Sequence, residues 1–211
     1  KDLLFAGFGF ACLWAYAGYA RKPSWGRYAS CLALAAASLL SKTMLVTLPG
    51  LLLLLDSWPL ARAERQRWPR LLLEKLPFLL LSLGAAAAIL GLQSEIAPEL
   101  TPTQRFGHAA MSYLFYLGKT LWPASLSGFY PHPYLPRSGG TAWSPLELAA
   151  GIALLAVLSA AAWRLRARRA YWLVGWLWFL GTLLPVLGLA SVAPNAFPAA
   201  QLGYASLHDL A

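Results

Sequence analysis

Lys42 is the residue whose position points most directly to a binding role. It lies between two apolar runs, residues 28–41 and 43–60. A lysine at membrane depth is costly, and it usually faces protein or a water-filled cavity. Its ammonium group could therefore bind the phosphate of a partner. A lysine at a helix turn can also extend its long stem to the lipid headgroups, and residue type alone favours neither interpretation.

A second lysine, Lys119, lies in a Gly-Lys-Thr tripeptide that resembles the end of a phosphate-binding loop. The full motif also requires a glycine five residues before Gly118. Tyr113 occupies that position, so the motif is not present. We interpret Lys119 as an interfacial cation beside Trp122, with a contact to phosphate as the alternative.

The histidines give little support to a metal site. Neither His108 nor His132 has a carboxylate or a cysteine at metal-ligand spacing. His132 belongs to a Phe-Tyr-Pro-His-Pro segment that also contains Tyr130. There it could hydrogen-bond a sugar or a phosphate, or it could stiffen the loop. No metal and no cofactor is expected, and no Ser-His-Asp arrangement indicates a catalytic nucleophile.

Asp56 is the carboxylate with the most apolar surroundings, because it follows five leucines. It could be a buried acid with a catalytic or ion-carrying role. The favoured interpretation is structural: an acid at a helix end, with Trp58 at the membrane interface and Arg62 as its candidate partner.

The composition places these residues in a membrane protein. Of the 211 residues, 59% are hydrophobic and 12% are charged, whereas roughly a quarter of the residues in soluble domains are charged. This argues against a soluble enzyme. The net charge of +9 could suggest nucleic acid, but the basic residues cluster at the ends of apolar segments, where membrane topology places them. The expected partner is the lipid bilayer, and nucleic acid is not expected.

The apolar runs predict an all-α, polytopic bundle of about six membrane helices. Single spans are expected at residues 3–20, 76–92, 145–163 and 171–192. Residues 28–60 as one helix would extend about 50 Å, which is much more than a bilayer core requires. We therefore predict a break at residues 41–43. The break gives a hairpin of two shorter helices with Lys42 at its far end.

The basic residues predict the orientation of this bundle. The hairpin returns the arginines of 62–70 to the side of Arg21, and those of 164–169 are expected there too, on the cytoplasmic side. Twelve of the 17 basic residues are then cytoplasmic. Residues 108–126 must lie at the outer membrane surface or re-enter the membrane. The aromatic loop with Tyr130 and His132 is expected at the same outer surface.

Several segments together resemble one family. They are SKTMLVTLP at 41–49, LLLLDSWPL at 52–60, EKLPF at 74–78, YLGKTLWP at 116–123, FYPHP at 129–133 and GWLWFLGTLLPV at 175–186. They are similar to segments of bacterial membrane proteins with tetratricopeptide (TPR) repeats, which are related to the animal transmembrane and TPR-containing O-mannosyltransferases. The resemblance covers the membrane region, residues 1–192. The tail, residues 193–211, does not match and is expected to be disordered.

The resemblance implies part of a C-type glycosyltransferase fold in the bacterial inner membrane. Such enzymes pass a sugar from a polyprenyl-phosphate donor to a hydroxyl group, often on a protein acceptor, outside the cytoplasm. The family's catalytic acid lies in an early external loop. This chain resembles the region that follows that loop, so we expect a middle portion of the enzyme that is inactive alone.

The resemblance also implies a donor site on the external side. Its candidate substrate-binding residues are Lys42, Lys119, Tyr130 and His132: Lys42 would contact the donor phosphate, Lys119 would lie on the same external side, and the loop with Tyr130 and His132 would border the sugar or the acceptor. Two alternatives remain. In a transporter or flippase-like protein, Lys42 and Asp56 would line a substrate path. In a non-catalytic anchor, the helices would only hold TPR repeats at the membrane.

Overall fold

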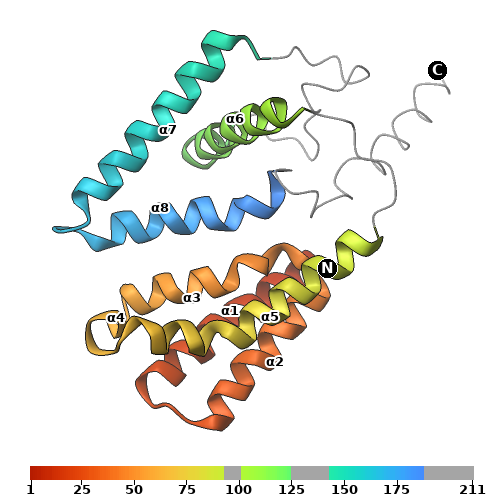
Figure 1. Cartoon of the computed structure of the whole chain (residues 1–211), viewed down its shortest axis with the longest axis vertical. Helices are drawn as coiled ribbons and strands as arrows, with labels where there is room; N and C mark the ends of the chain where they lie inside the picture. Colours follow the sequence, from red (N-terminus) through yellow and green to blue (C-terminus); the bar gives the residue numbers. More distant parts are fainter. Residues whose placement is uncertain (93–100, 125–142, 188–211) are drawn as a thin grey trace. The chain divides into compact units, whose positions relative to one another are not determined.

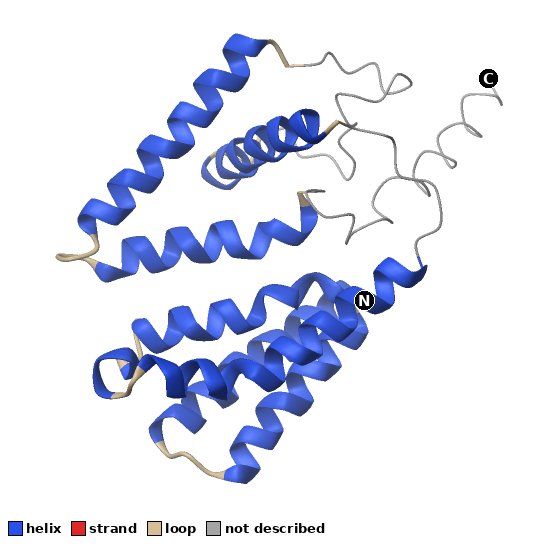
Figure 2. Ribbon diagram, viewed as in Figure 1, coloured by secondary structure: helices blue, strands red, loops and turns tan. Residues whose placement is uncertain are grey.

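The computed structural model describes residues 1–92, 101–124 and 143–187, and every regular element within them is a helix (Figure 2). The all-α prediction is confirmed for these residues. The chain divides into two compact units. The first comprises Lys1–Leu92 and Ala162–Pro185, and the second comprises Gln93–Ala161 and Val186–Ala211.

Six helices build the first unit (Figure 1). They are α1 (Asp2–Arg21), α2 (Trp25–Ser41), α3 (Leu48–Ser57), α4 (Arg62–Arg65), α5 (Trp68–Leu92) and α8 (Ala170–Leu183). Two 3-10 helices join them, η1 (Thr43–Thr47) before α3 and η3 (Leu184–Val186) after α8. Helices α1 and α2 form an antiparallel pair, and α3 and α5 pack on the same unit.

The predicted break in the long apolar run is present. Helix α2 starts at an N-cap serine, Ser24, whose side chain accepts a hydrogen bond from the backbone of Arg27. It ends at Ser41, and Lys42 is extended, with φ −163° and ψ 130°. The chain then makes η1 before Pro49 occupies the first turn of α3, where a proline is tolerated. The break therefore places Lys42 at the tip of a helical hairpin.

Small side chains let α1 and α2 approach closely. Cys12, Cys31 and Ala35 are fully buried in the core of the first unit. A Cβ atom added to Gly9 would lie 3.4 Å from Leu45 and 3.6 Å from Ser38. Close approach through small residues is the usual packing of helices in membranes. Larger leucines, with Phe78, fill the remaining space of this core.

Three helices are long and apolar enough to cross a membrane: α1, residues Trp68–Ala88 of α5, and α7 (Pro145–Leu165). Two shorter apolar helical segments, Thr43–Ser57 and Ala170–Val186, were also predicted as spans. Helix α5 begins eight residues before the predicted start at 76, because charged residues mask the helical pattern there. Residues 188–192 of the last predicted span lie outside the described residues. These helices indicate a membrane protein.

The second unit contains α6 (Pro102–Leu121) and most of α7. Helix α6 starts with a capping box, in which Thr101 and Gln104 each bond the other's backbone. It is not among the three helices that could cross a membrane. The prediction that residues 108–126 lie at the membrane surface or re-enter therefore stays a prediction.

Gly151 on α7 faces side chains of α6, since a Cβ atom there would lie 2.7 Å from the sulfur of Met111 and 3.2 Å from Leu114. We expect Gly151→Leu to destabilise the α6–α7 contact by about 1–3 kcal/mol through overpacking. Thermal unfolding in detergent would measure this. Met111→Ala should restore part of the loss. Gly7→Leu is the matched control, because Gly7 has open space around it, and an equal loss there would contradict the assignment.

Candidate functional site

One end of the first unit holds a buried cluster of charged groups, here called the ion cluster. It consists of Tyr16 on α1, Asp56 at the end of α3, Arg62 at the start of α4, and Glu74 and Lys75 on α5. Asp56 is completely buried, Lys75 is 3% exposed and Arg62 is 6% exposed. Charged groups this deep are stable only when they are paired.

In the ion cluster, each of the two cations pairs with both acids. Arg62 bridges the two acids, with 3.1 Å from Nη1 to Asp56 Oδ1 and 2.8 Å from Nη2 to Glu74 Oε2. Lys75 Nζ bridges the same acids, at 2.7 Å from Asp56 Oδ2 and 3.1 Å from Glu74 Oε1. The Tyr16 hydroxyl donates to the Asp56 carboxylate, 2.7 Å away, and accepts a hydrogen bond of 2.6 Å from Arg62.

The ion cluster is electrically balanced, with two cations against two anions. Burial by itself would lower the pKa of Arg62, but the hydrogen bond to Glu74 and the negative charge of Asp56 outweigh it, so the pKa of the guanidinium is raised. Arg62 therefore stays charged at any physiological pH. Because both carboxylates are fully engaged by cations, this arrangement suits a structural role better than proton transfer.

The geometry of the ion cluster favours the structural interpretation of Asp56 over a catalytic or ion-carrying one. Its predicted partner, Arg62, is confirmed by the ion pair. The acid is completely buried inside the unit, and its position at the depth of the membrane interface stays a prediction. Sequence reasoning missed Tyr16, Glu74 and Lys75 as its other partners. The available signal was the Glu-Lys pair beside an apolar run, because buried charges must find opposite charges.

Lys42 lies at the other end of the first unit. The start of α2 is beside the ion cluster, since Tyr28 donates a 2.7 Å hydrogen bond to the carbonyl of Glu74. Lys42 follows the end of α2, about 20 Å farther along at 1.5 Å per residue. Its ammonium group pairs with Asp2, the first residue of α1. The side chain of Lys42 is 37% exposed and that of Asp2 is 77% exposed, so the pair is accessible.

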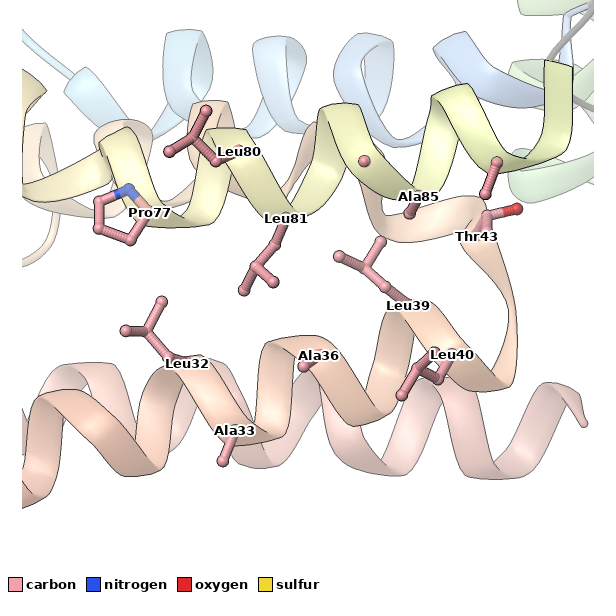
Figure 3. Close-up of a pocket in the computed structure, with 12 residues that line it drawn as sticks. Leu32, Ala33, Ala36, Leu39, Leu40, Thr43, Pro77, Leu80, Leu81 and Ala85 are labelled. Atoms are coloured by element: carbon pink, nitrogen blue, oxygen red, sulfur yellow. The ribbon is translucent and has the colours of Figure 1, made fainter. Parts of the chain in front are cut away.

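An open apolar groove of about 980 Å³ runs between α2 and α5 (Figure 3). Leucines from both helices line it, together with small residues such as Ala36 and Ala85. Thr43, the neighbour of Lys42, lies at one end of the groove and Pro77 lies toward the other. Thr43 is the lining residue with a polar side chain. The groove is thus an apolar trough with one polar side chain, next in sequence to Lys42, at its end.

No protein-family model, curated protein or solved structure matches the chain. Functional roles must therefore come from the geometry of the described residues and from the motif resemblance.

Lys119 belongs to the second unit, near the end of α6. Its ammonium group donates a 2.6 Å hydrogen bond to the carbonyl of Ala124 and lies 5.6 Å from the ring centre of Phe115. Trp122 lines the same shallow hollow of about 400 Å³. This position fits an interfacial cation. The other two candidate residues, Tyr130 and His132, lie outside the described residues.

Proposed function

We propose that the chain is the middle membrane portion of a glycosyltransferase with a C-type fold and about six membrane helices. In this proposal the enzyme takes a mannose-like sugar from a polyprenyl-phosphate donor. It passes the sugar to a protein hydroxyl on the outer side of the bacterial inner membrane. The observation that carries the proposal is the apolar groove whose end is lined by Thr43, the residue that follows Lys42. The catalytic acid is expected outside this portion.

The groove has the chemistry that a lipid-linked phosphate requires. Its leucine and alanine walls suit a branched hydrocarbon chain, and its open side would face the bilayer from which the lipid arrives. Van der Waals packing would hold the hydrocarbon chain of the lipid in the groove. The hydrophobic effect would contribute little, because membrane lipid is already apolar. Lys42 would supply charge-assisted hydrogen bonds to the phosphate, in exchange for its present ion pair with Asp2.

The ion cluster supports this arrangement indirectly. It joins α1, α3, α4 and α5 at one end of the unit and so fixes the hairpin that carries Lys42 at its tip. A transporter path through Asp56 is less favoured, because that carboxylate is completely buried and already paired with two cations.

The test is binding of a long-chain polyprenyl phosphate to the purified chain in detergent. We expect Lys42→Met to weaken binding about tenfold or more, since hydrogen bonds to charged groups contribute roughly 1.5–3 kcal/mol. Affinity for the corresponding polyprenol, which lacks the phosphate, should not change. Lys22→Met is the matched control for loss of a lysine, because Lys22 is exposed and follows α1 at the opposite end of the first unit. Equal binding of phosphate and alcohol, or no effect of Lys42→Met, would contradict the proposal.

A variant of the groove tests recognition of the lipid's hydrocarbon chain separately from recognition of its phosphate. Gly84 lines the groove, and a Cβ atom there would meet nothing within 4 Å. Gly84→Trp should therefore weaken binding of polyprenyl phosphate and polyprenol alike while the protein stays folded. Sugar transfer itself is to be measured with the complete gene product, by mass spectrometry of a hydroxyl-containing acceptor peptide.

A further inference from the structure

The end of the first unit that holds the ion cluster also carries a dense positive surface, here called the basic surface. Three segments supply it: residues 21–27, 65–70 and 164–169. Its ten exposed basic side chains are Arg21, Lys22, Arg27, Arg65, Arg67, Arg70, Arg164, Arg166, Arg168 and Arg169. The exposed acid next to them in sequence is Glu64. Membrane topology accounts for these charges being on one side of the membrane, but neither topology nor sugar transfer requires three separate segments to bring them onto one surface.

Side-chain contacts bring the first two segments together. The ring of Tyr28, just after Arg27, lies 5.3 Å from the ring of Tyr19, just before Arg21. The guanidinium of Arg62 lies 5.6 Å from the same Tyr19 ring. The turn between α1 and α2 is therefore adjacent to the turn that leads into α5.

Helix α8 brings the third basic segment, residues 164–169, to the same end of the unit. Trp58, at the end of α3, lies 6.0 Å from Tyr171 in the first turn of α8. Tyr171 follows directly after the arginines of 164–169. Both aromatic residues belong to the first unit, so the contact places all three basic segments at one end of a single unit.

A set of exposed tryptophans accompanies the three basic segments. It consists of Trp25, Trp58, Trp68, Trp163 and Trp172. Tryptophan is enriched where a membrane protein crosses the headgroup region. The guanidinium of Arg166 lies 3.7 Å from the ring centre of Trp163. In a membrane, these tryptophans would lie at the depth of the headgroups, with the basic side chains beside them.

The charges of the basic surface are not neutralised by the protein. The acids of the ion cluster are occupied by Arg62 and Lys75. Within the part of the chain that the structure describes, none of the ten exposed basic side chains makes an ion pair. A surface with so many unpaired cations attracts phosphate groups strongly at short range.

We propose that the basic surface binds the headgroups of anionic phospholipids in the adjoining leaflet. The inference rests on the membrane location in the proposed function and is independent of sugar transfer. Several headgroups would bind together, with their phosphates between arginines of neighbouring segments. Their acyl chains would lie beside the exposed tryptophans. Arginine suits this task because its planar group can donate two parallel hydrogen bonds to one phosphate.

The test compares phosphatidylglycerol with phosphatidylcholine, each titrated into the purified chain in detergent micelles. The readout is thermal unfolding together with quenching of tryptophan fluorescence by headgroup-labelled lipid. We expect phosphatidylglycerol to bind at least tenfold more tightly, with a strong dependence on salt. The triple variant Arg166→Gln, Arg168→Gln and Arg169→Gln should lose most of this preference. Each charge near the membrane surface contributes about fivefold, which corresponds to about 1 kcal/mol.

A second triple variant, Lys1→Gln, Arg105→Gln and Lys119→Gln, loses the same charge at positions outside the three basic segments and should keep the preference. Equal affinity for both lipids, or equal loss in the two triple variants, would overturn the proposal. Inorganic phosphate that stabilised the protein as much as phosphatidylglycerol would overturn it too. Lys42→Met should leave phosphatidylglycerol binding unchanged, so failure of the donor site and failure of this surface are distinguishable.

Discussion

Asp56→Asn is expected to destabilise the first unit by about 3–5 kcal/mol, because it leaves two buried cations to share one acid. Asp56 accepts from Arg62, Lys75 and Tyr16. Asparagine has nearly the same shape, so the loss would come from charge and not from packing. A large drop in the melting temperature of the purified protein in detergent, followed by circular dichroism, is the expected observation.

The double variant Asp56→Asn with Lys75→Gln provides the decisive comparison. It removes one charge of each sign and so returns the ion cluster to electrical balance. We expect it to be more stable than Asp56→Asn alone, by a coupling energy that a double-mutant cycle would measure. Glu64→Gln is the control, since Glu64 is an exposed acid on the neighbouring turn. Additive losses in the double variant would show that the acid and the lysine act independently.

The contrast between the two ends of the hairpin shows what the sequence could predict. The break at Lys42 was predictable because residues 28–60 are too long for one span, a constraint that concerns length alone. The start of α5 was not, because Arg70, Glu74 and Lys75 interrupt the apolar pattern before residue 76. Arg70 is exposed, whereas Glu74 and Lys75 are compatible with a buried helix only because Asp56 and Arg62 pair with them, and the sequence does not show that contact.

The candidate site, too, could be predicted from the sequence only in part. A cation at the hairpin tip could be inferred from one residue in one run. The groove could not, because its width depends on the distance between α2 and α5 and on which small residues face each other across it. Tyr16 carried no signal either, since a tyrosine in an apolar helix usually places its hydroxyl at the interface. Here that hydroxyl is buried against Asp56.

Opposite ends of the hairpin should react with reagents from opposite sides of the membrane. In intact cells, a membrane-impermeant maleimide is expected to label Lys42→Cys fully and Arg67→Cys not at all. Permeabilised cells should label both. The native Cys12 and Cys31 are completely buried, so they should add little background. The effect is all-or-none because a polar reagent does not cross an apolar bilayer core.

Labelling at the two positions tests whether α2 crosses the membrane. Arg67 lies on the turn beside the ion cluster, and Lys42 lies one helix length away, past the end of α2. If α2 crosses the membrane, the two residues must be on different sides, and the arginine-rich side faces the cytoplasm. Labelling of both residues from one side would mean that α2 does not cross. Exchanged labelling would place Lys42 in the cytoplasm, where it could not meet a donor on the outer face.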